Sequence, residues 1–550
     1  MASTYRPPEY PYVRPAELAA GGIARTPVAI VGAGPVGLAA AIDLAQQGID
    51  FIIVDDNNTV SVGSRAICYA KRALEILDRL GCGEPVCARG ISWKVGKVFH
   101  RDALAYRFDL LPEPGHKRPA FVNLQQYHLE EALVGRLSEL GHAVRWKNEA
   151  VGVAHDDEGV RVEVRTPDGH YAIEAEYLIA ADGARSPLRD MLGLEWKGQV
   201  FRDRFLIADV HMQGDFPAER WFWFDPPFHS GQSALLHRQA DDVWRIDFQL
   251  GWDTDPEEEK KPERVLPRIR ALLGDDRPFE LEWVSVYTFQ CRRLDRFVHG
   301  RVIFVGDAAH QVSPFGARGA NSGFQDTDNL CWKLARVLRG ESPPSLLASY
   351  DSERVEAADE NILNSTRATD FITPKSATSR VFRDAVLSLA QRHPFARRLV
   401  NSGRLSLPTT HRASLLSSVD ADRFDGAMLP GAPAADAPVC IDGREGWLLD
   451  QIGGRFELLL FAPFHVALAA ELRRVCGDTL RVTAIVPQGD SEAAVRCIED
   501  AQGLVRQRYD AAPGTAYLLR PDQHVVARWR NPTAAAVRAA LMRAQGRGEH

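Results

Sequence analysis

The fold is decided by the stretch Pro27-Val28-Ala29-Ile30-Val31-Gly32-Ala33-Gly34-Pro35-Val36-Gly37, in which an apolar run of strand length leads into a Gly-x-Gly-x-x-Gly turn. The following residues keep apolar side chains at helical spacing until Gly48 ends the pattern. A second apolar run, Phe51 to Val54, then ends at Asp55. The stretch therefore predicts a strand, a tight turn, a helix and a second parallel strand.

Each glycine of this turn has its own reason to be there. Gly32 permits the turn, Gly34 lets a pyrophosphate approach the backbone, and Gly37 lets the helix pack closely on its strand. Free N–H groups and the positive end of the helix dipole favour an anion at the helix start. Asp55 stands where a carboxylate can accept hydrogen bonds from a ribose. The sequence thus predicts a dinucleotide-binding unit of Rossmann type.

Length and composition set limits on the rest of the chain. At 550 residues, with 45% hydrophobic and 25% charged residues and a formal net charge of -7, the chain suits a globular protein of two or three domains, with no basic block for nucleic acid. The eight cysteines form no C-x-x-C pair, so we expect reduced thiols and no metal site. The first 26 residues lack the apolar core of a signal peptide, and the apolar run 456–470 is interrupted by Glu457, Pro463 and His465. We therefore expect a cytoplasmic protein without membrane contact.

Two further glycine-containing turns follow buried strands. Asp182-Gly183 directly follows the run Tyr177 to Ala181, and Gly306-Asp307 directly follows the run Arg301 to Val305. A glycine-rich loop, 314–323, then opens another helix, which again places backbone N–H donors at a helix start. Because open α/β sheets bind ligands at the carboxyl ends of their strands, the turns predict one shared site.

Residues 201–292 alternate apolar and polar side chains, as an antiparallel sheet does. Their polar face either meets solvent or covers a substrate pocket. His237 and His211 are candidates to orient or deprotonate a phenol, Arg245 and Gln249 to bind a carboxylate or hydroxyl, and Tyr287 to contact substrate. The alternatives are structural histidines, a solvated strand face and core packing, and for His310 we expect a supporting hydrogen bond.

The last part of the chain predicts another α/β unit. Residues 345–405 favour long helices, and 407–438 is rich in loops and proline. Strands over 456–461 and 480–486, helices over 466–474 and 491–501, two strands over 516–519 and 525–529, and a helix over 533–544 give a thioredoxin-like order. Phe461-Ala462-Pro463-Phe464 occupies the place of a redox C-x-x-C, so dithiol chemistry is not expected.

Taken together, five motifs resemble one family. They are Gly32 to Gly37, Ser64-Arg65-Ala66-Ile67, Asp182-Gly183, Gly306 to His310 and Asn321 to Asp326. In this order and spacing the chain resembles the class A flavoprotein monooxygenases, within them the aromatic hydroxylases of the hydroxyphenylpropionate and phenol hydroxylase type. The resemblance implies FAD as a tightly held cofactor, NAD(P)H as a transient reductant, and O2 activated as a flavin C4a-hydroperoxide that hydroxylates a small aromatic substrate.

The resemblance also implies an architecture. This is an α/β fold with a Rossmann-type FAD-binding domain, an inserted antiparallel β-sheet substrate domain as in p-hydroxybenzoate hydroxylase, and a C-terminal thioredoxin-like domain. The expected division is an N-terminal extension 1–26, the first part of the FAD-binding domain 27–200, the substrate domain 201–292, the returning FAD segment and helices 293–405, a linker 406–438 and the thioredoxin-like domain 439–550.

The residues that would hold FAD follow from the same motifs. The implied set is Gly32, Gly34, Pro35, Gly37, Asp55 and Asp56 for the ADP half; Ser64, Arg65, Gln126 and Val151 for ribose, phosphates and ribitol; Asp182 and Gly183 near the pyrophosphate; and Asp307, Pro314, Gly319, Ala320 and Asn321 for the ribitol and isoalloxazine. Asp55 departs from the family pattern, which often has Glu there.

Other functions remain open at this stage. Trp221-Phe222-Trp223-Phe224-Asp225-Pro226 partly resembles the W-x-W-x-I-P signature of flavin-dependent halogenases, with Asp225 in place of isoleucine. A halogenase or oxidase on the same scaffold and a non-catalytic flavin-binding protein are therefore alternatives. A homodimer joined through the C-terminal domain is also open.

Overall fold

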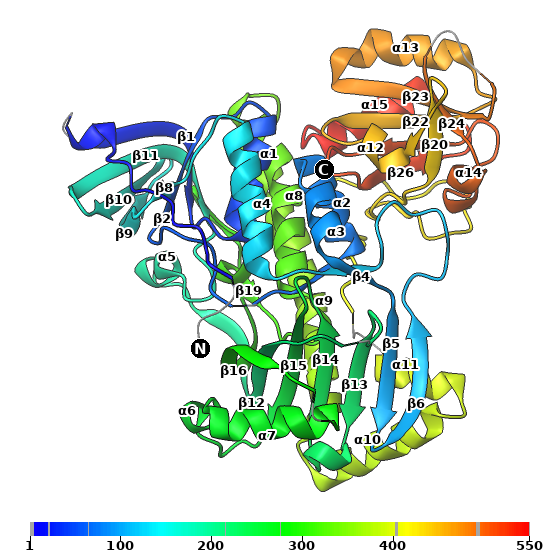
Figure 1. Cartoon of the computed structure of the whole chain (residues 1–550). Helices are drawn as coiled ribbons and strands as arrows, with labels where there is room; N and C mark the ends of the chain where they lie inside the picture. The colour runs from blue at the N-terminus through cyan, green and yellow to red at the C-terminus, as the bar shows by residue number, and fades with distance from the viewer. Residues whose placement is uncertain are drawn as a thin grey trace.

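A computed structural model describes residues 5–19, 22–63, 65–214, 216–275, 277–401, 405–490 and 495–548. Three regions are visible (Figure 1): a first sheet with its helices, a second sheet below it, and a C-terminal body to one side. The class is the mixed α/β fold that the sequence predicts.

The first sheet is built around the opening strand. Its order is β17 (Val298–His299), β18 (Val302–Phe304), β11 (Gly169–Ala180), β1 (Ile23–Val31), β2 (Phe51–Asp55) and β8 (Arg145–Trp146), and β9 (Glu149–His155) and β10 (Val160–Thr166) extend it antiparallel from β11. Strands β18, β11, β1, β2 and β8 run parallel. The first strand begins at Ile23 and not at Pro27, because residues 23–26 still pair with β11.

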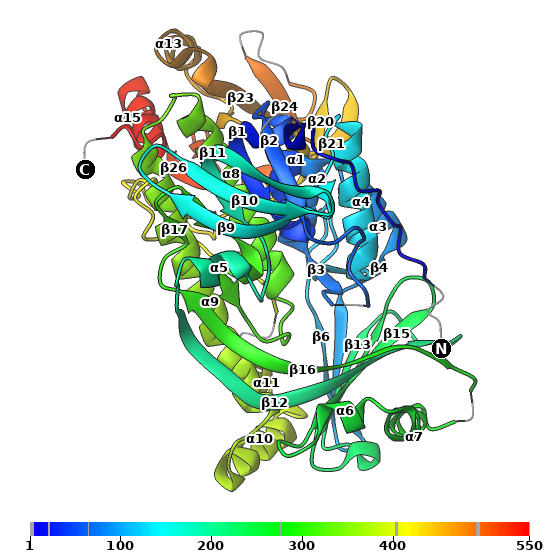
Figure 2. The same ribbon diagram turned by 90° about the vertical axis from the view of Figure 1, so that its left-hand side faces the viewer.

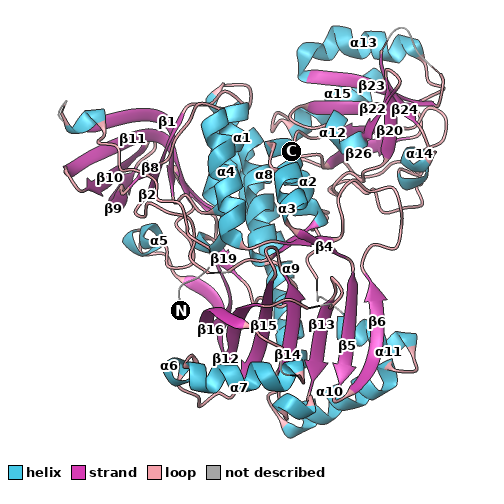
Figure 3. Ribbon diagram, viewed as in Figure 1, coloured by secondary structure: helices cyan, strands magenta, loops and turns pink. Residues whose placement is uncertain are grey.

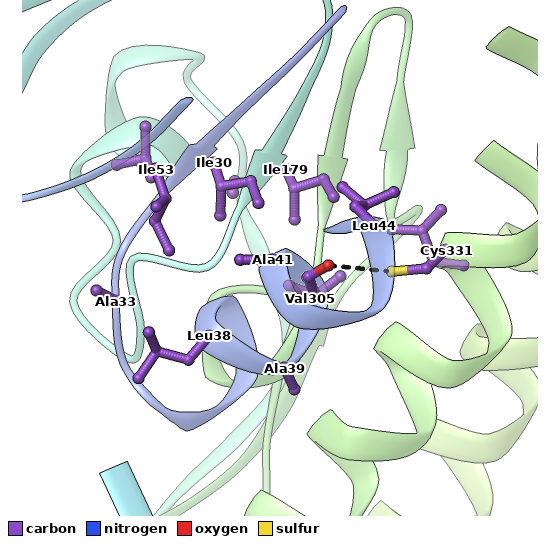
Figure 4. Packing of buried hydrophobic residues seen from close by; sticks show 14 of the residues in the cluster. Ile30, Ala33, Leu38, Ala39, Ala41, Leu44, Ile53, Ile179, Val305 and Cys331 are labelled. Atoms are coloured by element: carbon purple, nitrogen blue, oxygen red, sulfur yellow. Dashed lines mark hydrogen bonds between the residues drawn. The ribbon is translucent and has the colours of Figure 1, made fainter. Parts of the chain in front are cut away.

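Three helices cover one face of this sheet: α1 (Pro35–Gln46), α4 (Gln126–Glu139) and α8 (Gly319–Leu338) (Figure 3). Figure 4 shows how α1 lies against Ile30, Ile53 and Ile179. The run of buried alanines 39–41 has small side chains, which let α1 approach both the sheet and α8. Cys331 on α8 lies 3.9 Å from the carbonyl oxygen of Ala40, and the thiol donates.

The second sheet is antiparallel apart from one pair of strands. Its order is β19 (His310–Gln311), β16 (Glu280–Leu294), β12 (Trp196–His211), β15 (Val243–Leu250), β14 (Ser233–Arg238), β13 (Arg220–Phe224), β5 (Val95–His100) and β6 (Ala103–Asp109). Two of these strands, β5 and β6, come from inside the segment expected to form the first part of the FAD-binding domain. They join the second sheet because β5 pairs in parallel with β13, and no local sequence pattern predicts this pairing.

Helices enclose the second sheet on both faces. On one face α6 (Pro256–Glu259) and α7 (Pro262–Leu273) lie below it (Figure 2), and α7 shares a hydrophobic core with Trp244 and Phe248. On the other face α9 (Leu347–Ile372), α10 (Ala377–Ala390) and α11 (Pro394–Asn401) contribute side chains to a core with Phe205, Phe224 and Phe289. Most of the sheet is thus covered on both faces, while Tyr287 on β16 stays 42% exposed.

Smaller elements join the two sheets. A three-stranded sheet has the order β3 (Cys68–Ala70), β7 (Phe121–Asn123) and β4 (Ile91–Trp93), and α2 (Lys71–Leu80), α3 (Gly83–Arg89) and α5 (Pro187–Met191) are short connecting helices. Single 3-10 turns lie at Ala16–Leu18, Pro227–His229, Gly306–Ala308, Pro344–Leu346 and Gly477–Thr479.

The C-terminal body has a seven-stranded sheet. Its order is β21 (Arg444–Trp447), β20 (Pro438–Ile441), β24 (Arg496–Asp500), β23 (Leu480–Pro487), β22 (Phe456–Phe461), β25 (Ala516–Leu519) and β26 (Val525–Trp529), with helices α12 (Leu448–Gln451), α13 (Val466–Cys476), α14 (Leu504–Arg508) and α15 (Ala534–Ala544). The helix expected over 491–501 is wrong for 496–500. Those residues pair in parallel with β23, and this pairing overrides the helical tendency of the segment.

Buried charges join the C-terminal body to the first sheet's helices. The Glu353 carboxylate on α9 accepts hydrogen bonds from Arg520 (2.6 Å) and Lys333 (2.9 Å), and all three side chains are buried. Arg72 on α2 donates to the carbonyl oxygen of Asp522 at 2.8 Å. A buried pair of this kind is costly to break from one side, so the two bodies are held in one arrangement. In the part of the chain that the structure describes, no helix combines the length and apolarity needed to cross a membrane.

Candidate active site

The three glycine-containing turns meet at one edge of the first sheet. They follow β1, β11 and β18, which are neighbours in the sheet and point the same way. A Cβ on Gly32 would lie 2.4 Å from the carbonyl oxygen of Ala181, so the first turn touches the second. A Cβ on Gly306 would lie 3.1 Å from a methyl carbon of Val36, so the third turn touches the start of α1.

The first turn leaves space where the sequence predicts a phosphate. Gly32 has φ +103°, in the left-handed region, and a Cβ on Gly37 would lie 1.9 Å from the carbonyl oxygen of Gly32. Around Gly34, in contrast, a Cβ would meet no atom within 4 Å. Gly34 is the N-cap of α1, Pro35 follows it, and no side chain caps the helix. The N-terminal N–H groups of α1 thus face an open space suited to an anion.

Asp55 fixes this turn from the end of β2. Its carboxylate accepts hydrogen bonds from the backbone N–H groups of Ala33 (2.6 Å) and Asn57 (2.9 Å). Burial raises the pKa of Asp55, while these two donors act in the opposite direction. Asp56 next to it is exposed. The shorter side chain of Asp, compared with Glu, is therefore used to hold the glycine turn itself.

The loop 56–66 lies between α4 and the second sheet. Gln126 accepts a hydrogen bond from the backbone N–H of Ala66 (3.0 Å) and donates to Ser61 Oγ (2.9 Å) and to Glu130 (2.8 Å). Its amide is therefore occupied by the loop. Arg65 is exposed, and its carbonyl oxygen accepts a hydrogen bond from Arg245 on β15 (3.0 Å). Ser64 lies outside the described residues.

In the second turn, one carboxylate oxygen of Asp182 is buried without a hydrogen-bond partner. Asp182 Oδ2 accepts hydrogen bonds from Ser186 Oγ (2.7 Å) and from the backbone N–H of Leu188 (3.0 Å), whereas its Oδ1 is buried without a partner in the structure. Burial raises the pKa of this carboxyl. Gly183 follows with φ +76°, and Val151 lies half-buried on β9. A buried, unpaired acceptor needs a donor from elsewhere.

The third turn brings Asp307 to the start of α8. A Cβ on Gly319 would lie 3.8 Å from Asp307 Oδ1. Asp307 is exposed, yet surrounding protein raises its pKa by desolvation, with Arg65 acting in the opposite direction. Asp307 thus lies at the surface beside the start of α8, where the surrounding protein still desolvates its carboxyl group. Pro314 is exposed and Gly319 and Ala320 are half-buried at the same helix start, whose N-cap has no side-chain cap.

Asn321 and Asp326 hold the start of α8 in place. Asn321 accepts a hydrogen bond from the backbone N–H of Ala70 (2.8 Å) and donates to the carbonyl oxygen of Cys68 (2.9 Å), so its amide binds β3. Asp326 pairs with Arg354 (2.7 Å), lies 2.7 Å from His310 Nε2 and accepts from the backbone N–H of Gly306 (2.9 Å). The supporting hydrogen bond expected for His310 is thus confirmed. Asp326 belongs to one of the five motifs, but no pattern in the sequence indicates its partner Arg354.

Tyr287 lies on β16 of the second sheet, near the charges of Asp307 and Arg65. Its side chain is 42% exposed, yet desolvation raises its pKa to about 12, with the charge of Asp307 adding to the rise and Arg65 acting against it. Beside it an aromatic cluster joins the sheet to the loop before α8. Ring centroids lie 5.0 Å apart for Phe205 and Phe315 and 5.0 Å apart for Phe289 and Phe315. Phe315 was not singled out from the sequence, although it follows Pro314 directly.

His237 and Arg245 lie on the same face, in register with each other on β14 and β15. Both are buried. Arg245 donates to Asp247 (2.8 Å) as well as to the loop carbonyl of Arg65, so it is a structural link between sheet and loop. Burial and the charges of Arg220 and Arg245 hold the pKa of His237 well below its ordinary value. His237 Nδ1 is buried and has no partner in the structure.

These residues fit a flavin dinucleotide. Two uncapped helix starts supply N–H donors, the space at Gly34 is open, and the unpaired oxygen of Asp182 is available to a hydroxyl group. The site therefore defines a class of protein, the dinucleotide-binding flavoproteins with a second, substrate-covering sheet.

Comparison with known proteins identifies the family of the chain. Residues 25–365 match the family described as "FAD binding domain". Over 523 residues, 91% of this chain and 90% of the other, it is 31% identical to 6-methylpretetramide 4-monooxygenase of Streptomyces rimosus. It is 29% identical, over 92% of this chain and 93% of the other, to a 3-(3-hydroxy-phenyl)propionate/3-hydroxycinnamic acid hydroxylase of Burkholderia vietnamiensis (strain G4 / LMG 22486). The fold matches that of the flavin-dependent monooxygenase PieE, solved with FAD and substrate, with a TM-score of 0.80 at 24% identity over 95% of this chain and 99% of that one.

The chain belongs to this FAD-binding family. It is an FAD-dependent monooxygenase of the aromatic hydroxylase type, and the resemblance set out from the five motifs is confirmed.

Proposed function

We propose that this enzyme hydroxylates a phenolic ring that binds between Tyr287 and the polar side chains of β14 and β15. The observation that carries the proposal is the buried His237 Nδ1, which has no partner in the structure and lies on the sheet in register with Arg245, the residue that reaches the loop carbonyl of Arg65. The buried rings of Phe205, Phe289 and Phe315 pack this sheet against the loop that opens α8, so they hold the two sides of the proposed site together. The names of the relatives, a hydroxyphenylpropionate hydroxylase and a pretetramide monooxygenase, are consistent with such a ring.

The proposed placement of FAD uses all three turns. Gly32, Gly34, Pro35, Gly37, Asp55 and Asp56 surround the ADP half; Arg65, Gln126 and Val151 border the ribose and phosphates; Asp182 and Gly183 border the pyrophosphate; and Asp307, Pro314, Gly319, Ala320 and Asn321 border the ribitol and ring. When bound, the flavin accepts reducing equivalents from NAD(P)H and activates O2. The N–H groups at the helix start at Gly319 would stabilise negative charge on the ring of the bound flavin.

His237 is the residue that we propose to orient the substrate. Because its pKa is well below its ordinary value, the imidazole is neutral at physiological pH, and its unpaired Nδ1 can accept a hydrogen bond from a ring hydroxyl. Tyr287 remains protonated at neutral pH because its pKa is about 12, and it borders the substrate space as a hydrogen-bonding phenol.

Replacing His237 by Asn should lower kcat/KM by about tenfold through loss of one substrate hydrogen bond, with FAD content unchanged. His211→Asn, in the same sheet, is the matched control and should leave kcat/KM unchanged. Neither the wild type nor the control should show a step near pH 6.5, since the lowered pKa keeps His237 neutral on both sides of that pH. A wild-type profile that falls as the pH drops through 6.5, and that His237→Asn abolishes, would refute the neutral role.

One experiment decides between this function and its alternatives. Hydroxylated benzoates, phenylpropionates and simple phenols are each added to the holoenzyme, with NADH or NADPH, in air, with and without halide. We expect faster NAD(P)H oxidation with one of these phenols and a product heavier by one oxygen atom. Hydrogen peroxide alone would indicate an oxidase, a halogenated product a halogenase, and a protein that takes up no flavin a role without catalysis.

The C-terminal body we propose to be a thioredoxin-like domain over residues 439–550 without redox chemistry. The sheet order β26-β25-β22-β23, with β22 and β23 parallel and joined by α13, supports it. Among the described residues, all eight cysteines are free thiols, which accords with a cytoplasmic location. The boundaries 1–26, 27–200, 201–292, 293–405 and 406–438 remain proposals, as does a homodimer through this domain.

A further inference from the structure

Residues 5–18, here called the N-terminal strap, precede the region that matches the family, which starts at residue 25. The strap forms no strand of the first sheet; it ends in the single 3-10 turn Ala16–Leu18 before β1. In Figure 2 it runs in dark blue along the outside of the molecule past α4. The strap contacts three parts of the protein: the loop after Asp55, α4 and β8.

The middle of the strap binds the loop that follows Asp55. The backbone N–H of Tyr10 donates to the carbonyl oxygen of Asn58 at 2.8 Å, and Glu9 forms an antiparallel bridge with Thr59. The Tyr10 ring stacks on Trp146 at 4.7 Å between centroids and 8° between planes. Trp146 lies on β8, which pairs with β2 at Asp55 itself.

Both ends of the strap are anchored outside this loop. Tyr5 stacks on Tyr127 of α4, with ring centroids 3.8 Å apart, and its hydroxyl donates to Glu131 at 2.8 Å. At the other end Glu17 pairs with Arg145 of β8 at 3.1 Å. Stacked aromatic rings lose little conformational entropy when ordered, so they suit a fixed anchor.

The same loop is held on its other side by α4. Glu130 accepts hydrogen bonds from the backbone N–H of Ser61 and, at 2.6 Å, from Ser61 Oγ, and Gln126 binds Ala66 and Ser61. The loop begins beside Asp55 and ends at Arg65, which are both in the proposed FAD set. The strap and α4 therefore clamp, from two sides, the segment that borders the ADP half of the cofactor.

We propose that the N-terminal strap is a positioning segment for FAD: through Asn58, Thr59 and Trp146 it holds the chain that follows Asp55 in place beside the ADP half, and it slows release of the cofactor. The proposal rests on the placement of FAD given above. A loop ordered before binding does not have to be ordered by the cofactor, so the strap raises affinity through preorganisation.

Tyr10→Ala tests the proposal, with Tyr12→Ala as the matched control. Tyr12 belongs to the same strap, but its hydroxyl donates to Thr166 at the far hairpin of β10 and β11. Apo-protein is titrated with FAD by the quenching of flavin fluorescence, FAD release is followed after dilution, and the melting temperature of each apo-protein is recorded. We expect Tyr10→Ala to raise the FAD Kd by about tenfold, which is one step of about 1.4 kcal/mol, and to speed release. Tyr12→Ala should stay within about twofold, and Tyr10→Phe, which keeps the stack, should bind as the wild type does.

The possible outcomes distinguish a failure of the proposed role of the strap from a failure of the proposed placement of FAD. A Kd unchanged by Tyr10→Ala, in a wild type that binds FAD, overturns the role of the strap and leaves the placement of FAD intact. An equal rise in Tyr10→Ala and Tyr12→Ala, with a lower apo melting temperature in both, also overturns it, since the strap then acts on the fold alone. A folded wild type that binds no FAD refutes both the placement and the strap.

Discussion

Gly34→Ala is expected to give a folded protein that has lost FAD. The added Cβ would meet no protein atom within 4 Å, and the backbone of Gly34 is extended with φ -72°, so the apo-protein has no reason to unfold. The methyl group would occupy the open space where we place the pyrophosphate, at the uncapped start of α1. We expect FAD affinity to fall by about 100-fold or more, measured by titration and by the ratio of absorbance at 450 and 280 nm after desalting.

The controls for this variant are two other glycines. Gly135 on α4 is exposed, and a Cβ there also meets nothing within 4 Å, so Gly135→Ala should keep its FAD and its stability. Gly37→Ala should fail differently: its Cβ would lie 1.9 Å from the carbonyl oxygen of Gly32, and the turn itself would be distorted. Unchanged flavin binding in Gly34→Ala would contradict the placement of the ADP half.

Asp326→Ala should produce the largest loss of stability. The carboxylate is fully buried and pairs with Arg354 and His310. Removing it leaves the buried guanidinium of Arg354 unpaired, at a cost of about 3–5 kcal/mol in the free energy of unfolding. Because Asp326 also holds the backbone N–H of Gly306, the Asp307 turn should loosen and FAD should bind more weakly. Urea unfolding of the apo-protein measures the first effect.

The control is Asp359→Ala, which removes a pair with Arg293 at the surface. Asp359 is 56% exposed, so the loss should be below about 1 kcal/mol. Similar losses in the two variants would contradict the role assigned to burial.

Asp326 also makes stability depend on pH. Burial alone would raise its pKa, but His310 and Arg354 together bring the pKa below its ordinary value of 3.8. A carboxyl whose folded pKa is lowered stabilises the fold fully above the unfolded pKa, and this contribution is lost as the pH falls through the folded pKa. The difference in urea midpoint between wild type and Asp326→Ala should therefore be constant from pH 7 to 5 and shrink below pH 4. A difference that grows in acid would contradict the ion pair.

Local pattern was enough to predict the part of the fold that binds the nucleotide. The turn at Gly32, the strand ending at Asp55 and the helix opened by the loop 314–323 can each be predicted from a short run of residues, and parallel strands bring their carboxyl ends to one edge. From this edge the sequence predicted a dinucleotide site, and the resemblance carried by the five motifs implied FAD and the monooxygenase class, which are confirmed.

The rest depends on contacts between distant residues. The pairing of β5 with β13 joins residues more than a hundred positions apart in the sequence, and the apolar pattern of neither strand predicts it. For the same reason the sequence assigned substrate roles to the side chain of Arg245 without finding its bond to the loop carbonyl of Arg65. It also named Gln126 as a cofactor contact without finding the bonds of its amide to Ala66 and Ser61.

The crystal structure of the holoenzyme with FAD tests the central statement most directly, namely that Gly34, Asp182 and Asp307 border one flavin. The predicted result is a pyrophosphate at the uncapped start of α1, a cofactor hydroxyl on Asp182 Oδ1, and the ring system between the start of α8 and Tyr287. A dinucleotide bound away from any one of these three turns would contradict the account.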